Sequence, residues 1–350
     1  MSRAEPALDL VTTATLVATA AAMLVRPRHV AAVARSPLLP AAGRQAKAAA
    51  RGLARQFAPP APQTRLGRLI SSLWPSPAVT QTAGRRLNAS AALLSFSVLA
   101  DSAVEHYRGS FENRAMYTPL AVGALTLGAS LFGMTDRRAA RHFLRDTIYA
   151  VAAVSGLTGL GFHAYNILKR PGGLSWLNLF YAAPIGAPMA LALAGFLGRG
   201  AEQVRDTPPF RRPGLLRMPA GRTLAAVTAA GLAGTVGEAG LLHFRGAYHD
   251  PFMAAPVTIP PIAAGLLSAA AVCPGRAIDH LARWWLRLTA LIGFAGVGFH
   301  AYGIARNMGG WRNWSQNVLN GPPLPAPPSF TGLALAGLAA LSLIEEESDG

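Results

Sequence analysis

The chain has 350 residues, of which 51% are hydrophobic and 14% are charged, and its formal net charge is +16. Continuously apolar runs of about 18 residues recur along it, and this is the length that a helix needs to cross a hydrocarbon core roughly 30 Å thick. The runs predict an all-α polytopic membrane protein and exclude a membrane β-barrel, whose strands alternate apolar and polar residues. The single cysteine, Cys273, excludes an intrachain disulfide and a metal cage of thiolates.

The first apolar run, at about residues 7–25, predicts an N-terminal transmembrane anchor. Arg26 and Arg28 follow it directly, which favours an uncleaved segment with its N-terminus outside; a cleaved signal peptide is the alternative. In the basic linker that continues to residue 86, charged and apolar residues recur at helical spacing, as in the stretch TRLGRLISSLW. We expect residues 1–86 to combine the anchor with surface helices on an anionic inner leaflet, and a solvated linker is the alternative.

Eight further runs predict the transmembrane core, and prolines inside several of them predict kinks. The runs lie at about 87–104, 118–135, 147–168, 179–198, 223–243, 254–273, 286–304 and 330–344. The first four form one four-helix unit over residues 87–198. A cytoplasmic linker, residues 199–222, separates it from a second four-helix unit, which with its acidic tail covers residues 223–350.

The two units repeat one another at a constant shift in residue number. The shift carries His106 onto His243 and His163 onto His300 without a gap. Eight of the thirteen residues in GFHAYNILKRPGG, which begins at Gly161, recur in GFHAYGIARNMGG. Because four is an even number of helices, both units enter the membrane from the same side. We therefore expect two tandem parallel four-helix repeats, related by an axis along the membrane normal.

The loops differ in basic charge, and this difference predicts the orientation. Of the 32 basic residues, 24 fall in loops 26–86, 136–146, 199–222 and 274–287. We expect these loops on the cytoplasmic side, so the net charge is a signal of topology and does not indicate a nucleic-acid partner. The 30 arginines against 2 lysines are typical of high-GC genomes and favour a bacterial plasma membrane.

Four histidines lie near the outer ends of the first and third helices of each unit. They are His106 and His163 in the first unit and His243 and His300 in the second. In an up-and-down bundle these helices are diagonal, so their ends can face one another across the core. Paired histidines of this kind can bind haem b or a metal ion, or flank a quinone. The alternative is that they meet headgroups and water in an aromatic belt.

Neighbouring residues extend this hypothesis. Gly159 and Gly296 precede the third-helix histidines by four residues, so the helix face below each imidazole can admit a flat ligand, unless it serves close helix packing. Arg108 and Arg245 follow the first-helix histidines at the outer rim. There a guanidinium can pair with a haem propionate or another anion.

Asp101 and Glu238 coincide under the same shift, each seven residues before its arginine. A carboxyl group about 10 Å below the rim is costly in lipid and indicates a functional site. We expect these two candidate catalytic residues to pass protons, and a buried structural hydrogen bond is the alternative.

These patterns give two hypotheses for the function. The first is a redox membrane subunit that binds haem b or quinone through the paired histidines and works with a peripheral redox subunit. Its plan is similar to that of quinol-handling membrane subunits of bacterial respiratory complexes, although no motif of a particular family is present. The second is a proton- or metal-coupled transporter with its site at the repeat interface. A purely structural role in the lipid bilayer is the remaining alternative.

Overall fold

The computed structural model describes residues 79–138, 140–181, 184–205 and 218–349, and all regular structure in these residues is helical. The long helices are α5 (Val79–Arg108), α6 (Thr118–Thr135), α7 (Phe143–Leu168), α9 (Gly186–Arg205), α10 (Ala220–Arg245), α11 (Ala255–Val272), α12 (Arg276–Arg306) and α14 (Pro328–Asp349). Two short helices, α8 (Trp176–Tyr181) and α13 (Trp314–Asn320), lie in the loops before α9 and α14. The predicted anchor at 7–25 and the predicted surface helices lie outside the described residues.

Seven of these helices are long and apolar enough to cross a membrane. The prediction of an all-α multi-pass membrane protein agrees with this finding, although eight core spans were expected. Among the long helices of the described residues, α9 is the one that is not apolar enough to count as a membrane span. Its second half contains three charged residues, Arg199, Glu202 and Arg205. The fourth span was also expected to begin at residue 179. Instead, the separate helix α8 ends at Tyr181 and α9 begins after Pro184, which cannot donate a backbone hydrogen bond.

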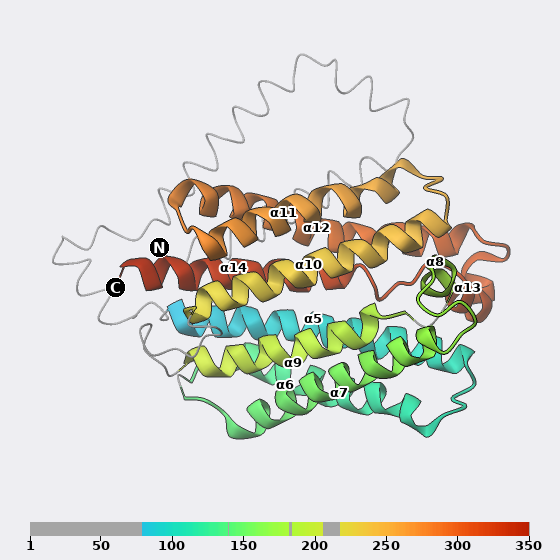
Figure 1. The fold of residues 1–350 in the computed structure, drawn as a ribbon, viewed down its shortest axis with the longest axis horizontal. Helices are drawn as coiled ribbons and strands as arrows, with labels where there is room; N and C mark the ends of the chain where they lie inside the picture. Colours follow the sequence, from blue (N-terminus) through green and yellow to red (C-terminus); the bar gives the residue numbers. More distant parts are fainter. Residues whose placement is uncertain (1–78, 139, 182–183, 206–217, 350) are drawn as a thin grey trace, which may run out of the picture. The chain divides into compact units, whose positions relative to one another are not determined.

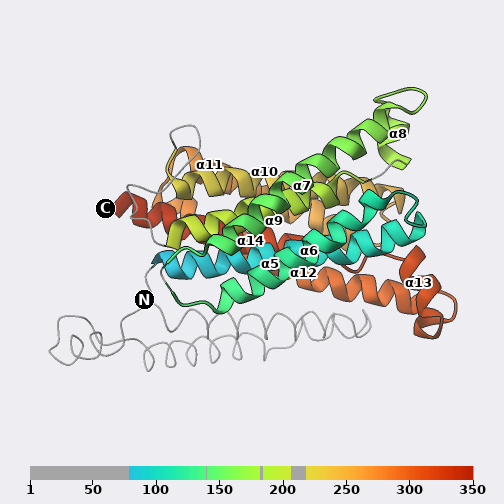
Figure 2. The same cartoon turned by 90° about the horizontal axis from the view of Figure 1, so that it is seen from below.

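The long helices form two rings of four. In the first half (residues 79–205), each long helix packs against the next and α9 closes the ring against α5, so α5 and α7 are diagonal. The second half (residues 218–349) has the same order, with α14 closing against α10 and α10 diagonal to α12. The rings meet mainly through α5 and α14, with a smaller contact between α9 and α10 (Figures 1 and 2).

The loops gather at two ends of this bundle. The loops that contain α8 and α13 lie at one end, whereas the C-terminal end of α14 lies at the other (Figure 1). Helices α5 and α10 both begin at the end where α14 finishes, so the two rings run in the same direction. Following the predicted orientation, we call the end with α8 and α13 the outer end and the opposite one the inner end.

The core and the lipid-facing surface follow from this arrangement. Leucines of the four central helices are fully buried, with Leu94, Leu197, Leu232 and Leu333 at most 1% exposed. Large apolar side chains on the peripheral helices α6 and α7 are instead exposed, among them Leu125, Phe132, Val154 and Leu157. Apolar surface of this extent on membrane-length helices is in contact with the lipid bilayer.

An arginine caps the C-terminal end of a helix at corresponding positions of the two halves. Arg85 donates to the carbonyl oxygen of Met134 at 2.7 Å, near the end of α6. Arg222, which corresponds to Arg85 under the shift between the units, donates to that of Ala271 at 2.5 Å, near the end of α11. These bonds satisfy carbonyls that a helix leaves without a partner at its C-terminus. The same local solution therefore stabilises the inner ends of α6 and α11.

The outer loops also correspond, with one difference in length. Gly173 and Gly310 both have a positive φ, of 52° and 51°, which glycine adopts without steric cost. Each accepts a 2.8 Å hydrogen bond from an asparagine side chain, that of Asn178 in the first half and that of Asn317 in the second. The second asparagine comes two positions later than the shift predicts, because the second loop is longer by two residues. Beyond these loops, the shift between corresponding residues is larger by two.

Candidate functional site

His106 and His243 lie near the outer ends of α5 and α10, and each forms a hydrogen bond with the segment that follows its helix. The Nδ1 atom of His106 is 2.6 Å from the carbonyl oxygen of Met116, and that of His243 is 2.8 Å from the carbonyl oxygen of Met253. A carbonyl oxygen only accepts hydrogen bonds, so Nδ1 carries the proton in both rings. In the neutral ring, Nε2 then keeps its lone pair for a ligand or a proton.

His163 and His300 repeat this arrangement on α7 and α12. Their Nδ1 atoms donate to the carbonyl oxygens of Pro184 and Pro323, at 2.7 Å for His300. Each also interacts electrostatically with the first-helix histidine of its own half. The structure thus places the predicted histidines within electrostatic reach of one another, two in each ring. A backbone carbonyl on Nδ1 is also the partner that orients many metal-binding histidines.

The glycines below the third-helix histidines lie in helix contacts. A Cβ atom on Gly159 would lie 3.2 Å from the Cβ of Pro188, and one on Gly296 would lie 2.7 Å from the Cβ of Pro327. The faces that the sequence left open for a flat ligand are therefore covered by prolines, from α9 in the first half and from the residue before α14 in the second. The packing alternative accounts for both glycines.

Arg108 and Arg245 occupy corresponding places but have different partners. Arg108 donates to Glu105 on its own helix, at 2.8 Å. Arg245 instead lies over the rings of Phe180 and Tyr181, 5.6 Å from each centroid. Because α8 carries both rings, it reaches from the first half to the first helix of the second half. Glu105 already neutralises the charge of Arg108. Of these two arginines, Arg245 is therefore the better candidate to bind an external anion.

Asp101 and Glu238 lie within electrostatic reach of one another, near the contact between the two halves. Both are partly buried, Asp101 on α5 and Glu238 on α10. Glu105 is within electrostatic reach of Asp101 as well. Glu238 accepts a hydrogen bond from the backbone N–H of Gly186, at the start of α9, and a Cβ atom on that glycine would overlap the carboxyl group. The fold therefore places the two acidic residues of the repeat in the same region of the protein.

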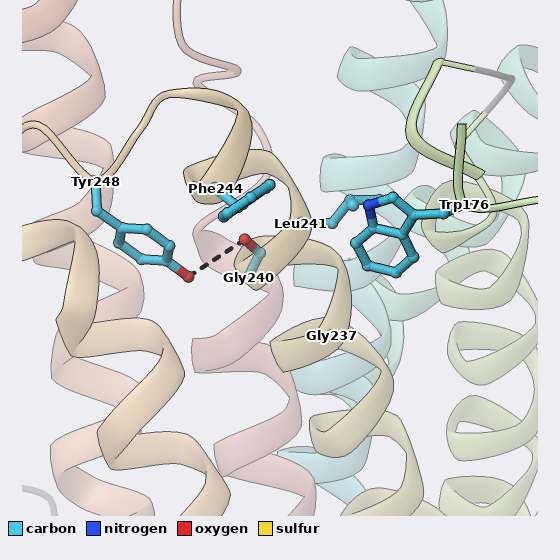
Figure 3. Close-up of a pocket in the computed structure, with 6 residues that line it drawn as sticks. All are labelled: Trp176, Gly237, Gly240, Leu241, Phe244 and Tyr248. Carbon is cyan, nitrogen blue, oxygen red and sulfur yellow. Dashed lines mark hydrogen bonds between the residues drawn. The ribbon is translucent and has the colours of Figure 1, made fainter. Parts of the chain in front are cut away.

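A shallow pocket of about 300 Å³ opens along α10 near its outer end. Trp176 of α8 forms one wall, and Phe244 and Tyr248 form another (Figure 3). The hydroxyl of Tyr248 donates to the carbonyl oxygen of Gly240 at 3.2 Å, so the lining is apolar and aromatic. The pocket suits an apolar group.

A cluster of charges at the inner end of the first half was not predicted from the sequence. Arg145 of α7 donates to both carboxylate oxygens of Glu202 of α9, at 2.9 Å each, and to Asp136 at 2.8 Å. The side chains of Arg145 and Glu202 are only 3% and 0% exposed. Glu202 also accepts the backbone N–H of His142 at 3.0 Å. Four charge-assisted bonds therefore stabilise one buried ion pair.

Arg205 completes this inner charge cluster. It donates to the carbonyl oxygen of Gly133 at 2.7 Å and lies 3.5 Å from Glu202. Burial alone would raise the pKa of Asp136, but hydrogen bonds from the backbone N–H of Arg138 and from the Arg145 guanidinium outweigh it and lower that pKa below its usual value. Two arginines and two carboxylates balance one another, which is a condition for burying ions at moderate cost.

The signal for this cluster was present in the sequence, at positions where the two units differ. Arg145 corresponds to Ala282, and Glu202 corresponds to Leu341. Residues that the two units share indicated the histidines and the two carboxyl groups. Charged residues present in one unit and apolar in the other indicate the inner charge cluster instead.

No protein-family model matches the chain, and no curated protein or solved structure gives a significant match. Across the described residues, no group of three or more histidine, cysteine, aspartate or glutamate side chains is placed to hold a metal ion. The argument for a function therefore depends on the geometry of this chain.

Proposed function

We propose that the protein is a proton-coupled transporter of a bacterial plasma membrane, built from two tandem parallel four-helix repeats, with its coupling site at Asp101 and Glu238. The observation that carries the proposal is that the two carboxyl groups lie within electrostatic reach of one another near the contact between the halves, where Glu238 accepts the backbone N–H of Gly186. Transporters made of repeats place their coupling sites at the repeat interface. The common packing order and common direction of the two rings support the repeat.

The paired carboxyl groups have the chemistry that proton coupling needs. Two neighbouring carboxyl groups that share one proton avoid the repulsion of two negative charges. An acidic side chain inside a membrane span is costly, and proton transfer is a common reason for keeping one there. Proton uptake and release at this pair can therefore be linked to a change in the contact between the halves.

The contact between Glu238 and the start of α9 supports such a change. Glu238 is held by the backbone of Gly186, so the position of its carboxyl group depends on how α9 lies against α10. The contact between α9 and α10 is smaller than that between α5 and α14. A rocking motion that opens the smaller contact would separate Glu238 from Gly186 while the larger contact stays closed.

Infrared difference spectroscopy tests the proton site directly. The wild-type protein, reconstituted in lipid, should show a protonated carboxyl C=O band that disappears as the pH rises. The band should be lost or shifted in Asp101→Asn and in Glu238→Gln, whereas Glu112→Gln, in the exposed outer loop, should leave it unchanged. A spectrum without a band that depends on Asp101 or Glu238 would refute the coupling site.

A flux assay tests transport. Inverted vesicles are acidified by respiration, and mono- and divalent cations are then added one at a time while an acridine dye reports the internal pH. We expect at least one cation to release protons through the wild-type protein and not through Asp101→Asn. If organic amines, tested next, also fail to distinguish these two proteins, proton-coupled transport of cationic substrates is excluded.

The histidine pairs favour a second candidate, the redox subunit. Each half pairs two imidazoles whose Nδ1 atoms are oriented by backbone carbonyls, as in many metal and haem sites. A haem would bring electron transfer, and a quinone would bring two-electron, two-proton chemistry. The residues fit only in part, because prolines cover Gly159 and Gly296 and a carboxylate neutralises Arg108. The histidines could still hold a ligand on another face.

Absorption spectroscopy separates the two candidates. A haem-binding subunit gives a red preparation with a reducible Soret band, which His163→Ala should remove from the first half while the protein stays inserted. A quinone-binding subunit instead retains stoichiometric quinone on purification, and the same substitution should release it. His142→Ala, in the inner loop, is the control for both. A colourless and quinone-free wild-type preparation would rule out this candidate.

A further inference from the structure

Buried polar side chains line the interior of the first half between its inner end and Asp101. We call this set the polar file, and it consists of Asn88, Ser95 and Ser102 of α5, Thr126 and Ser130 of α6, Arg145 and Tyr149 of α7, and Glu202 of α9. No member is more than 5% exposed. Burying polar groups inside a membrane protein is costly, so a set that extends through one half needs an explanation.

The corresponding positions of the second half are all apolar. Under the shift between the units, which grows by two after the longer outer loop, they are Ala225, Leu232, Ala239, Ala263, Leu267, Ala282, Leu286 and Leu341. At these eight positions the interiors of the two rings therefore differ, although the second half buries the hydroxyls of Thr228, Thr289 and Thr331 and that of Thr228 has no partner in the described residues. A packing requirement common to both rings cannot explain the polar file, because the second ring meets that requirement with apolar side chains.

Hydrogen bonds connect the inner part of the polar file across three helices. The hydroxyl of Tyr149 donates to the side chain of Asn88 and lies 3.2 Å from the hydroxyl of Ser130. One helical turn earlier on α7, Arg145 holds Glu202. The outer part follows α5, where Ser95 lies two turns beyond Asn88, about 10 Å along the helix axis.

Three buried hydroxyls on α5 have no hydrogen-bond partner in the described part of the chain. They belong to Ser90, Ser95 and Ser97, and none is more than 4% exposed. A buried hydroxyl without a partner is unfavourable, and such groups in a native protein call for water or an ion. Ser90 and Ser97 lie on the face of α5 that carries Asp101, and Ser97 is one helical turn before it, whereas Ser95 lies on the face of the polar file. Water that passes from the polar file to Asp101 therefore has to pass around α5.

We propose that water enters the first half along the polar file and supplies protons from the inner end to Asp101 and Glu238, whereas the second half stays dry. Water molecules bridging the side-chain oxygens would form a chain along which each oxygen accepts one proton and passes one on, so that no charge remains behind. The destination of the protons rests on the proposed function, but the entry of water does not.

Cysteine labelling measures the entry of water by itself. Cys273 is the single cysteine of the chain and is exposed, so Cys273→Ser supplies a background without thiols. In it, Ser95→Cys is compared with Leu232→Cys, the corresponding position of the second half. The reagent is 2-aminoethyl methanethiosulfonate, a small cation that needs a hydrated thiolate. Size-exclusion chromatography and the thermal midpoint show that each variant is folded.

We expect the thiol at residue 95 to react at least tenfold faster than the thiol at residue 232. Leu232→Cys leaves a cavity and Ser95→Cys does not, so any bias favours the control position. Equal rates, or no reaction at residue 95, would overturn the proposal. Ser130→Cys and Leu267→Cys, at two fully buried corresponding positions, form a second matched pair with the same expected order of rates.

The proton route is tested separately by a kinetic measurement. Tyr149→Phe removes one hydroxyl from the polar file and keeps the ring. After a pH jump, the carboxyl infrared band should change several-fold more slowly in this variant, with an unchanged final amplitude. A wild-type rate would overturn the route. If labelling is as expected but no carboxyl band exists, the proposed function fails while the entry of water stands, so the two failures are distinguishable.

Discussion

The inner charge cluster allows a quantitative prediction from a double-mutant cycle. Glu202 is fully buried and accepts two bonds from Arg145 and one from the backbone of His142. Glu202→Leu leaves a buried guanidinium with Asp136 as its remaining carboxylate, and Arg145→Met leaves a buried carboxylate beside Arg205 at 3.5 Å. Breaking one partner of a buried pair costs about 3–5 kcal/mol, so each single change should lower the free energy of unfolding by that amount.

The double variant, Arg145→Met with Glu202→Leu, should be far less damaging. It removes one positive and one negative charge, keeps the side-chain volume and resembles the apolar interior of the second half. We expect a cost below about 1.5 kcal/mol, typical of volume-conserving apolar cores, against about 6–10 kcal/mol for the sum of the single changes. Leu341→Met, at the position that corresponds to Glu202, sets the scale of an ordinary core change.

Reversible unfolding in mixed micelles, titrated with sodium dodecyl sulfate and followed by circular dichroism, measures all four free energies. Additive costs in the cycle, within about 0.5 kcal/mol, would refute the idea that the two residues act as one neutral unit.

Three further predictions concern other parts of the protein. In the Cys273→Ser background, an impermeant thiol reagent should label a cysteine at Ser110 in intact cells and should not label one at Gly350; the opposite pattern would invert the orientation. Gly186→Ala should destabilise the protein by about 1–3 kcal/mol, because its Cβ would overlap the Glu238 carboxyl group, whereas Gly128→Ala, with no heavy atom of the described residues within 4 Å of that Cβ, should be neutral or stabilising in thermal unfolding. The pKa of Asp136 is lower in the folded protein than in the unfolded chain, so its stabilising contribution is present above the unfolded pKa and is lost as the pH falls through the folded pKa. Asp136→Asn should therefore flatten the decline of the thermal midpoint on the acid side, and an unchanged profile would contradict this.

Much of the helical framework could be predicted from the sequence because apolar runs of membrane length have few alternatives. The predicted span at 118–135 coincides with α6, whose start is fixed by Pro119 and whose end is followed by Asp136. The start of α9 was missed because the sequence stays apolar through α8 and on to residue 185. Hydropathy does not distinguish a buried helix from a capping segment, and this explains the difference.

The candidate site was predictable only where the two units agree. Matching positions led to the four histidines and to Asp101 and Glu238, which the fold places in pairs within electrostatic reach. The glycines near the histidines were ambiguous, because a glycine is expected both where a ligand lies against a helix and where a neighbouring helix does. The partner of Gly159 is Pro188, and no periodicity within α7 contains that information.

The short helices α8 and α13 each contact the other half as well as their own. Phe180 of α8 packs edge-to-face on Phe244 of α10, and α13 contacts α5. Because α8 also contacts α7 and α13 also contacts α12, each short helix bridges the two rings, as an arm does that one subunit of a two-fold dimer lays on the other. A single four-helix gene product could assemble with a second copy in this way, and duplication followed by fusion would preserve these contacts within one chain. Once fused, the two copies no longer need identical interiors, and one is able to become polar while the other remains apolar.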